Sequence, residues 1–242
     1  MIDFNDVSFS YPGGPTVLKG VSFHIEKGGR VGLIGANGAG KSTILKAMLG
    51  LISVSGPAAI TVSGLPMNSA NLPAIRKKLG YVLQDSDNQM FMPTVLDDMV
   101  FGPMNYGATR AGAEAKAEAV LSDLGLTGLK NRHNHKLSGG EKRMAAIATI
   151  LAMEPEGLVM DEPSSSLDPK NRRILINLLN RLTQTKVIAS HDLDLILDTC
   201  DRVILISQGE VKADGPAQEI LRDRAILMEN DLELPLSLGD RA

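Results

Sequence analysis

The segment at residues 35–43, GANGAGKST, constrains this chain most strongly, because it reads Gly-x-x-x-x-Gly-Lys-Ser. Glycines at these positions let backbone N–H groups approach an anion closely, and the lysine and hydroxyl that follow can reach a polyphosphate and its metal ion. Such a loop belongs between a buried strand and a helix. Residues 31–34 are an apolar strand and residues 41–49 read as a helix. The segment therefore predicts a phosphate-binding α/β fold.

Two further motifs follow along the chain. Residues 158–163, LVMDEP, end an apolar strand in two adjacent carboxylates, Asp161 and Glu162, which suit a metal ion and an attacking water. Residues 137–141, LSGGE, lie between the other two motifs. Its Ser-x-x-Glu spacing is a helix capping box, but capping alone does not require two glycines in the first turn. Bare amides at a helix N-terminus can contact an anion, which makes phosphate binding the stronger interpretation.

The rest of the chain alternates strands and helices around a helical insertion at about residues 90–152. Thr109 is predicted to cap a helix that stops at Gly125, and Asp168 with Pro169 to begin another. Alternating apolar residues predict two short strands near residues 2–4 and 7–9, and Gln208-Gly209 a hairpin turn. The remaining predicted strands are residues 17–25, 30–34, 60–62, 78–83, 158–160, 186–189, 203–207 and 210–213.

Bulk composition narrows the class of protein. The chain has 242 residues and a formal net charge of −3, which argues against broad binding to nucleic acid. The one cysteine, Cys200, excludes an intrachain disulfide framework and fits a reducing compartment. We find no run of about 18 apolar residues that predicts a membrane span, and no signal-peptide pattern at the N-terminus. Any role at a membrane is therefore expected to involve a partner.

Taken together, residues 35–43, 137–141 and 158–163 resemble the ATP-binding-cassette (ABC) ATPases. The resemblance implies an α/β phosphate-loop (RecA-like) domain with an antiparallel β subdomain and an inserted helical subdomain. It implies ATP and Mg²⁺ as cofactors, ATP hydrolysis, and a head-to-tail dimer of two copies. We expect the ATPase domain to span residues 1–220, with a C-terminal tail at 221–242. A small phosphate-loop kinase or GTPase would leave LSGGE unexplained.

The resemblance also assigns roles to single residues. Glu162 is expected to polarise the attacking water from the other face of its strand, with Lys41, Gln84 and His191 acting on the γ-phosphate. The expected Mg²⁺ site is Ser42, Gln84 and Asp161. The expected nucleotide-binding residues are Tyr11, Gly35, Asn37, Gly38, Ala39, Gly40, Lys41, Ser42, Thr43, Ser138, Gly139, Gly140 and Asp168.

Several of these residues have an ordinary structural interpretation beside the functional one. Tyr11 is either the aromatic that stacks on adenine or a turn residue next to Pro12. Asp168 can cap a helix and still contact the opposite nucleotide site. His133 and His135 lack carboxylate or thiolate companions, so we interpret them as loop residues and not as metal ligands. The methionine-rich stretch at residues 90–104 is either core or a groove for a membrane partner.

Within the ABC family, four segments resemble the energy-coupling-factor branch and its cobalt and nickel ATPases. In that branch the ATPases act with a transmembrane coupling protein and a small substrate-capture membrane protein, so we expect a peripheral location on the cytoplasmic face of the cell membrane. Two positions depart from the family pattern: Gly29 stands where family members often have Glu, and Glu141 stands where they more commonly have Gln. A vitamin importer, another ABC transporter and a soluble ABC ATPase remain alternatives. The four segments are residues 9–14, 83–91, 100–107 and 190–211, and residues 233–238 are similar in character.

Overall fold

A six-stranded sheet forms the centre of the protein, in a computed structural model that describes residues 1–54 and 59–239. Five strands are parallel to their neighbours, and β10 at one edge runs antiparallel to β9. Parallel strands buried on both faces are runs of apolar residues, as in the LVM segment of β7 and the VIA segment of β8. The sheet order is β10 (Glu210–Pro216), β9 (Arg202–Ser207), β3 (Arg30–Ile34), β8 (Thr185–Ala189), β7 (Gly157–Asp161), β6 (Leu79–Val82).

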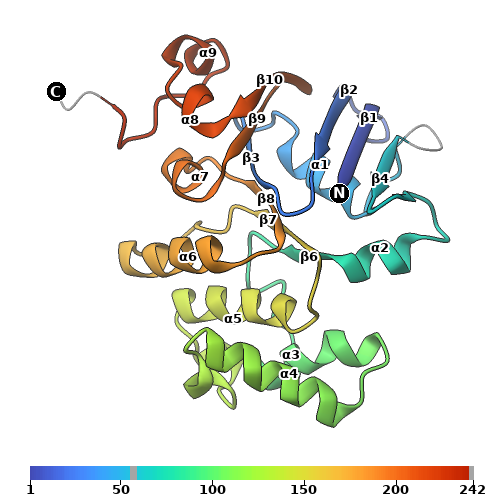
Figure 1. The fold of residues 1–242 in the computed structure, drawn as a ribbon, viewed down its shortest axis with the longest axis vertical. Helices are drawn as coiled ribbons and strands as arrows, with labels where there is room; N and C mark the ends of the chain where they lie inside the picture. Colours follow the sequence, from blue (N-terminus) through green and yellow to red (C-terminus); the bar gives the residue numbers. More distant parts are fainter. Residues whose placement is uncertain (55–58, 240–242) are drawn as a thin grey trace.

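A second, antiparallel sheet lies on one side of the central sheet (Figure 1). Its strands, in spatial order, are β2 (Thr16–Ile25), β1 (Ile2–Ser10), β4 (Ile60–Val62) and β5 (Leu65–Pro66). Alternate side chains of β1 and β2 enter a hydrophobic cluster that also contains helix α1 (Lys41–Met48). The helix that follows the phosphate loop is therefore held between the two sheets.

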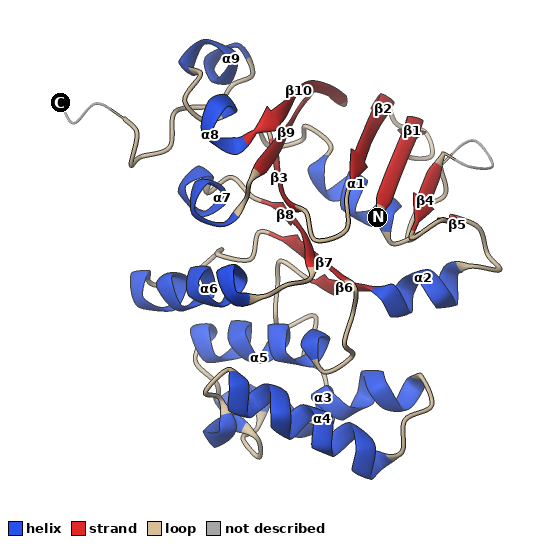
Figure 2. Ribbon diagram, viewed as in Figure 1, coloured by secondary structure: helices blue, strands red, loops and turns tan. Residues whose placement is uncertain are grey.

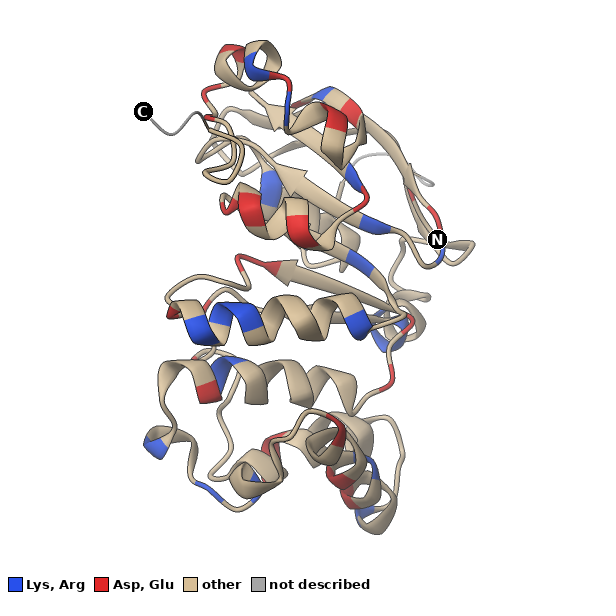
Figure 3. Ribbon diagram, turned by 60° about the vertical axis from the view of Figure 1, so that its left-hand side comes forward, with Lys and Arg blue, Asp and Glu red and all other residues tan. Residues whose placement is uncertain are grey.

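Helices α6 (Pro169–Arg181) and α7 (Leu193–Thr199) lie on the other side of the central sheet (Figure 2). Helix α6 carries several basic positions and the neighbouring α7 several acidic ones, as the charge colouring of the ribbon in Figure 3 shows. Arg172 pairs with Asp192 and Arg173 with Asp198 across this boundary. The opposed charges pair α6 with both the start and the end of α7.

The helical subdomain projects from the β6 end of the sheet (Figure 1). It contains α3 (Val95–Asn105), α4 (Arg110–Asp123) and α5 (Gly139–Leu151). Helix α5 has two buried faces: Met144, Ile147 and Leu151 join the cluster beneath the central sheet. An alanine face (Ala145, Ala146, Ala148 and Ala152) joins the cluster of α3 and α4. One helix therefore belongs to both hydrophobic clusters.

The C-terminal segment returns to the core. Helices α8 (Ala217–Ile220) and α9 (Arg224–Glu229) place Leu221 and Leu227 in the cluster of the central sheet. Beyond them, the backbone N–H groups of Leu236 and Ser237 donate to the Asp194 carboxylate at 2.9 and 3.0 Å. The boundary at residue 220 stays a prediction, and residues 240–242 of the predicted tail lie outside the described residues.

The expected fold class is confirmed, and several element predictions hold in detail. Thr109 caps α4, Gly125 follows it in the left-handed region (φ 68°), and Asp168 caps α6 with Pro169 in its first turn. Gln208 and Gly209 both have positive φ, as a tight type I′ hairpin turn requires. Among the described residues, no helix is long and apolar enough to cross a membrane.

Three local predictions are wrong. The two short N-terminal strands are one strand, because Asp6 adopts a left-handed conformation (φ 50°) that lets β1 continue through a bulge. Helix α2 (Leu72–Lys78) was not predicted, so the strand expected at 78–83 begins one residue later. Glu162 does not occupy the other face of β7: it follows the strand in a left-handed bend (φ 46°).

Candidate functional site

A cavity of about 550 Å³ lies at the carboxyl ends of β3 and β7, over the glycine-rich loop. Ligands of open parallel α/β sheets bind at this edge. The lining combines residues from five separate parts of the sequence, which the fold brings together. They are Val17, Asn37, Gly38, Ala39, Gly40, Lys41, Ser42, Thr43, Gln84, Asp161, Glu162 and His191.

The glycine-rich loop is shaped by backbone conformations that only glycine adopts readily. Gly35, Gly38 and Gly40 all have positive φ, and a Cβ on Gly35 would lie 2.1 Å from the carbonyl oxygen of Ile206. Gly40 leads directly into α1, so the unpaired N–H groups of the first helical turn face the cavity end of the loop. These amides and the helix dipole together favour a bound phosphate.

Lys41 is the buried cation of the cavity. Its Nζ donates to the carbonyl oxygens of Gly35 at 2.6 Å and Ala36 at 3.1 Å, so it is held along the loop. Burial lowers the pKa of Lys41, while the charges of Glu162 and Asp161 oppose that shift. A polyphosphate in the cavity would offer Lys41 stronger, charged acceptors than the two carbonyls.

Asp161 ends β7 at the floor of the cavity. Burial raises the pKa of its carboxyl group, and hydrogen bonds from Ser42 and Tyr81 oppose that shift, with the Tyr81 hydroxyl 3.4 Å from Oδ2. The Ser42 hydroxyl, the Asp161 carboxylate and the Gln84 amide oxygen are hard oxygen donors, which is the ligand chemistry that Mg²⁺ prefers. The residues present therefore fit a Mg²⁺ ion shared with a nucleotide phosphate.

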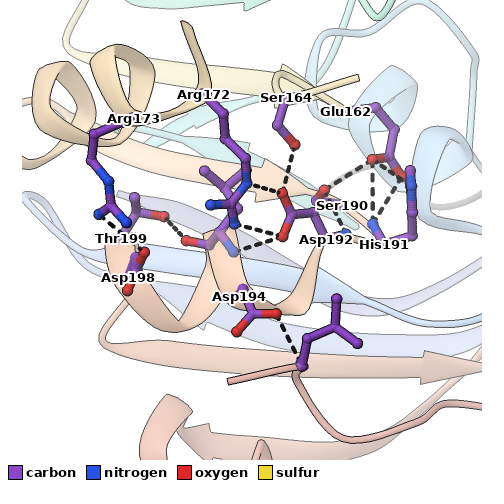
Figure 4. A network of polar contacts seen from close by, with 12 residues as sticks. Glu162, Ser164, Arg172, Arg173, Ser190, His191, Asp192, Asp194, Asp198 and Thr199 are labelled. Atoms are coloured by element: carbon purple, nitrogen blue, oxygen red, sulfur yellow. Dashed lines mark hydrogen bonds and ion pairs between the residues drawn. The ribbon is translucent and has the colours of Figure 1, made fainter. Parts of the chain in front are cut away.

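Glu162 is held by the segment that follows β8. Its backbone N–H donates to the Ala189 carbonyl oxygen at 2.8 Å, and its Oε1 accepts from the His191 N–H at 3.0 Å. Its Oε2 lies 2.9 Å from Ser190 Oγ and 2.8 Å from His191 Nδ1. Figure 4 shows this carboxylate and the His191 ring side by side. The predicted base and the predicted switch histidine therefore touch each other.

Gln84 lines the cavity from a loop that is fastened to α5. The buried guanidinium of Arg143 donates to the carbonyl oxygens of Leu83, at 2.6 Å, and Gln84. Gln89, further along the loop, donates to the Ala146 carbonyl oxygen of the same helix at 2.6 Å. These hydrogen bonds tie the backbone at Gln84 to α5 of the helical subdomain.

The LSGGE segment lies at the N-terminus of α5, and its residues are not among those lining the described cavity. The Ser138 hydroxyl accepts from the Glu141 N–H at 3.3 Å, and the Glu141 carboxylate accepts from the Ser138 N–H at 2.8 Å. The capping box therefore forms, and it uses a lone pair of Ser138 while leaving the hydroxyl proton for an anion. Capping and phosphate binding are compatible here.

Gly140 and Asp168 are linked through Asn171. A Cβ on Gly140 would lie 2.3 Å from the Asn171 side chain, whereas one on Gly139 would meet nothing within 4 Å. Asp168 caps α6 by accepting from the Asn171 N–H at 2.8 Å and from its side chain at 2.6 Å. The glycine at 140 thus lets the first turn of α6 approach α5, while the one at 139 leaves an open surface.

The remaining sequence candidates occupy different places. Tyr11 lies outside the cavity lining, with its hydroxyl 3.5 Å from Thr43 Oγ1 and its ring edge-on to Phe9. His133 and His135 lie together, 5.4 Å between ring centroids, on the helical subdomain. No group of three or more His, Cys, Asp or Glu residues in the described part of the chain is arranged to hold a metal ion.

Sequence reasoning missed three residues that shape the site. Val17 lines the cavity, Ser190 contacts the Glu162 carboxylate, and Asn171 joins the two helix N-termini. The position of Ser190 immediately before His191 was the available signal. Nothing in the local sequence points to Val17 or Asn171, because their contacts come from segments far apart in the chain.

Comparisons with known proteins agree with this geometry. The family described as ABC transporter matches residues 18–165. The energy-coupling factor transporter ATP-binding protein EcfA of Methanothermobacter thermautotrophicus is 41% identical over 239 residues, covering 97% of this chain and 77% of the relative.

Two solved structures have the same fold. One is cbiO1 of Clostridium perfringens, described as part of the ABC transporter complex cbiONQ, with a TM-score of 0.82 and 30% identity over 97% of this chain and 95% of that one. The other is a dimer of the ATP-binding cassette MJ0796 bound to ADP and Pi, with a TM-score of 0.80 and 26% identity over 90% and 99%.

Proposed function

This chain belongs to the ABC transporter family and is the ATP-binding subunit of such a transporter, and from that premise we propose that it powers an importer of the energy-coupling-factor type. Its ATPase domain hydrolyses ATP in a reaction coupled to transport. Support for the branch comes from the likeness to EcfA and cbiO1, both of which this chain matches over 97% of its length. The proposed cargo is a transition-metal ion, cobalt or nickel.

The proposal assigns Glu162 as the general base. The observation that carries it is the meeting of Lys41, Asp161, Glu162, Gln84 and His191 at one cavity over the phosphate loop. Lys41 and the loop amides would hold the β- and γ-phosphates. Ser42, Gln84 and Asp161 would hold a Mg²⁺ ion, which would supply positive charge beside the phosphates. Glu162 takes the proton of the attacking water, and His191, beside it, donates a hydrogen bond to the γ-phosphate.

We assign Ser138, Gly139 and Gly140 to a nucleotide held by a second copy of the chain. The α5 N-terminus presents unpaired amides and a hydroxyl proton, yet it lies apart from the cavity that its own phosphate loop lines. A head-to-tail dimer resolves this separation, because each copy then supplies the anion-binding helix end for the other. The dimeric structure of MJ0796 supports the arrangement.

The helical subdomain supplies the surface for the membrane partners. Its methionine-rich stretch divides: Met90 and Met99 are buried in the core, whereas Phe91, Phe101 and Met104 are exposed, with Phe91 at 63%. The rings of Phe91 and Phe101 meet edge-on, 5.0 Å between centroids, and form one apolar patch. The patch follows the Gln84 loop in the chain, so a membrane helix resting there would sense the state of the nucleotide site.

Purification from membranes tests the function. Tagged chain extracted in mild detergent should bring a transmembrane coupling protein and a small capture protein with it. Reconstituted vesicles should then accumulate radioactive Co²⁺ or Ni²⁺ when ATP is supplied on the side of this subunit, and excess unlabelled metal should compete. Uptake of a vitamin that excess metal does not inhibit would overturn the cargo assignment. Failure to retrieve any membrane protein would overturn the proposal that this chain belongs to an importer.

A further inference from the structure

Ser190 is a buried residue that the proposed mechanism does not use. It lies between β8 and α7, its side chain is 0% exposed, and its Oγ is 2.9 Å from Glu162 Oε2 (Figure 4). Its neighbour His191 also contacts Glu162, but the side chain of His191 is 69% exposed. Ser190 therefore provides the side-chain contact to this carboxylate that is shielded from solvent.

The Ser190 hydroxyl donates to the Glu162 carboxylate, because an ionised carboxylate can only accept. The backbone N–H of Asp192 donates to Ser190 Oγ at 3.1 Å, and an N–H can only donate. That contact occupies a lone pair of the serine oxygen, so the hydroxyl proton is free to point at the Glu162 carboxylate. The contact is a charge-assisted hydrogen bond, which is stronger than one between neutral groups.

The support beneath Ser190 is rigid. Asp192 caps α7 by accepting from the Leu195 N–H at 2.9 Å, and it accepts two parallel bonds from Arg172, at 2.7 and 2.8 Å. Burial raises the pKa of Asp192, but the bonds from Arg172 and Leu195 outweigh it, so the pKa is lowered and Asp192 stays charged. Ser190 is thus placed by α6 and α7, and not by a free loop.

Glu162 needs such support because its backbone ends the strand in a left-handed bend, which is an unfavourable conformation for a residue other than glycine. A glutamate side chain has three rotatable bonds, and a base must lie within hydrogen-bond reach of its proton. We propose that Ser190 is a positioning residue, whose hydroxyl holds the Glu162 carboxylate in the orientation needed for water activation. This inference rests on the proposed role of Glu162 as the base.

Steady-state ATP hydrolysis by the purified chain tests the inference. Ser190→Ala should lower kcat about tenfold, since a hydrogen bond to a charged group is lost, and leave KM within about twofold. Ser164→Ala is the matched control, because the Ser164 hydroxyl donates to Asp192 Oδ2 at 3.2 Å and makes no hydrogen bond to the Glu162 carboxylate. Ser164→Ala should keep kcat within about twofold, because Arg172 and the Leu195 N–H still hold Asp192 in place. Ser190→Cys keeps the shape with a weaker donor, and it carries the test if the alanine variant does not fold.

A second measurement separates positioning from a structural role. In a Glu162→Gln background, adding Ser190→Ala should not change ATP affinity or ATP-dependent dimerisation, because Ser190 acts through the carboxylate. Loss of either would show that Ser190 has only a structural role in the segment between β8 and α7. An unchanged kcat in Ser190→Ala would overturn the positioning role of Ser190 but not the role of Glu162 as the base. Hydrolysis at the wild-type rate by Glu162→Gln itself would instead overturn the base assignment.

Discussion

Two regions of this chain are built to meet phosphate, and they are built differently. The phosphate loop leads into α1 and lies in a cavity where Lys41 converges with the side chains of Gln84, Asp161, Glu162 and His191. The N-terminus of α5 has the same helix-end chemistry but presents an open surface, where a Cβ at residue 139 would meet nothing within 4 Å. In our proposal, the first region binds an anion within one chain, and the second completes the site of a second copy.

The largest expected effect is on the rate of hydrolysis at the phosphate loop, with ATP binding left unchanged. Glu162→Gln should lower kcat by about 10²- to 10⁴-fold, the usual contribution of a general base. It should preserve ATP affinity, because Lys41 and the loop amides remain. The protein should then accumulate as an ATP-bound dimer, measurable by size-exclusion chromatography with and without Mg-ATP. A monomer under saturating ATP would contradict the proposed ATP-dependent dimer.

Lys41→Ala should weaken binding in the same region. Removing a buried cation that faces the phosphates should raise the Kd for ATP about 10- to 100-fold, the effect of losing hydrogen bonds to charged groups. Titration with a fluorescent ATP analogue measures the change. Lys46→Ala, on the same helix but outside the cavity lining, is the control and should bind normally.

Gly139→Asp tests the second region. The added side chain has room in the isolated chain, and an acidic residue suits the first turn of a helix, so folding and ATP affinity should be preserved. In a dimer the same carboxylate would face the partner's γ-phosphate, and hydrolysis should be abolished.

Mixing the two variants sharpens the comparison. Lys41→Ala and Gly139→Asp chains should each be inactive alone, yet a mixed dimer contains one site with an intact loop and an intact α5 N-terminus. Activity should therefore reappear on mixing, rising with the fraction of mixed dimers. No recovery would show that both regions act within one chain.

A smaller effect on hydrolysis is expected at the exposed apolar patch. Phe91→Asp should leave ATP hydrolysis by the isolated chain within about twofold, because surface substitutions away from the site change little. It should remove copurification with membrane proteins, since an unpaired charge would be buried in the interface. Met228→Asp, at a comparably exposed apolar residue on α9, is the matched control and should still copurify.

The smallest effect is expected at His133 and His135. Alanine at either position should leave the Kd for ATP and kcat within about twofold, because both rings lie on the helical subdomain outside the cavity lining. Isothermal titration with ATP and a hydrolysis assay check this. A large loss in either variant would revive a metal or regulatory role for the pair.

Much of the first region could be predicted from sequence because its residues are contiguous. A loop, a strand and a helix within residues 31–48 fix the positions of Lys41 and Ser42 by local geometry. Strand alternation failed at Glu162, because the chain turns at that residue and its side chain is placed by Ser190 and His191, which follow β8.

The second region was recognisable by motif but not by surroundings. Ser138 and Glu141 form the expected capping box, a local arrangement. The approach of Asn171 to Gly140 joins segments about thirty residues apart, which no periodicity reveals. Helix α2 escaped prediction for a related reason: it is only seven residues long, and of these only Ile75 is buried, so its apolar pattern is weak.

The two buried faces of α5 have a consequence for how the molecule opens and unfolds. Its alanine face belongs to the cluster of α3 and α4, and the face of Met144, Ile147 and Leu151 to the cluster of the central sheet. Local unfolding of either cluster exposes one side of the helix while the other side still holds it. The amide hydrogens of α5 should therefore exchange with solvent only through openings that disrupt both clusters, more slowly than those of α4. The helical subdomain and the nucleotide-binding core are in this sense one cooperative unit, joined along a single helix.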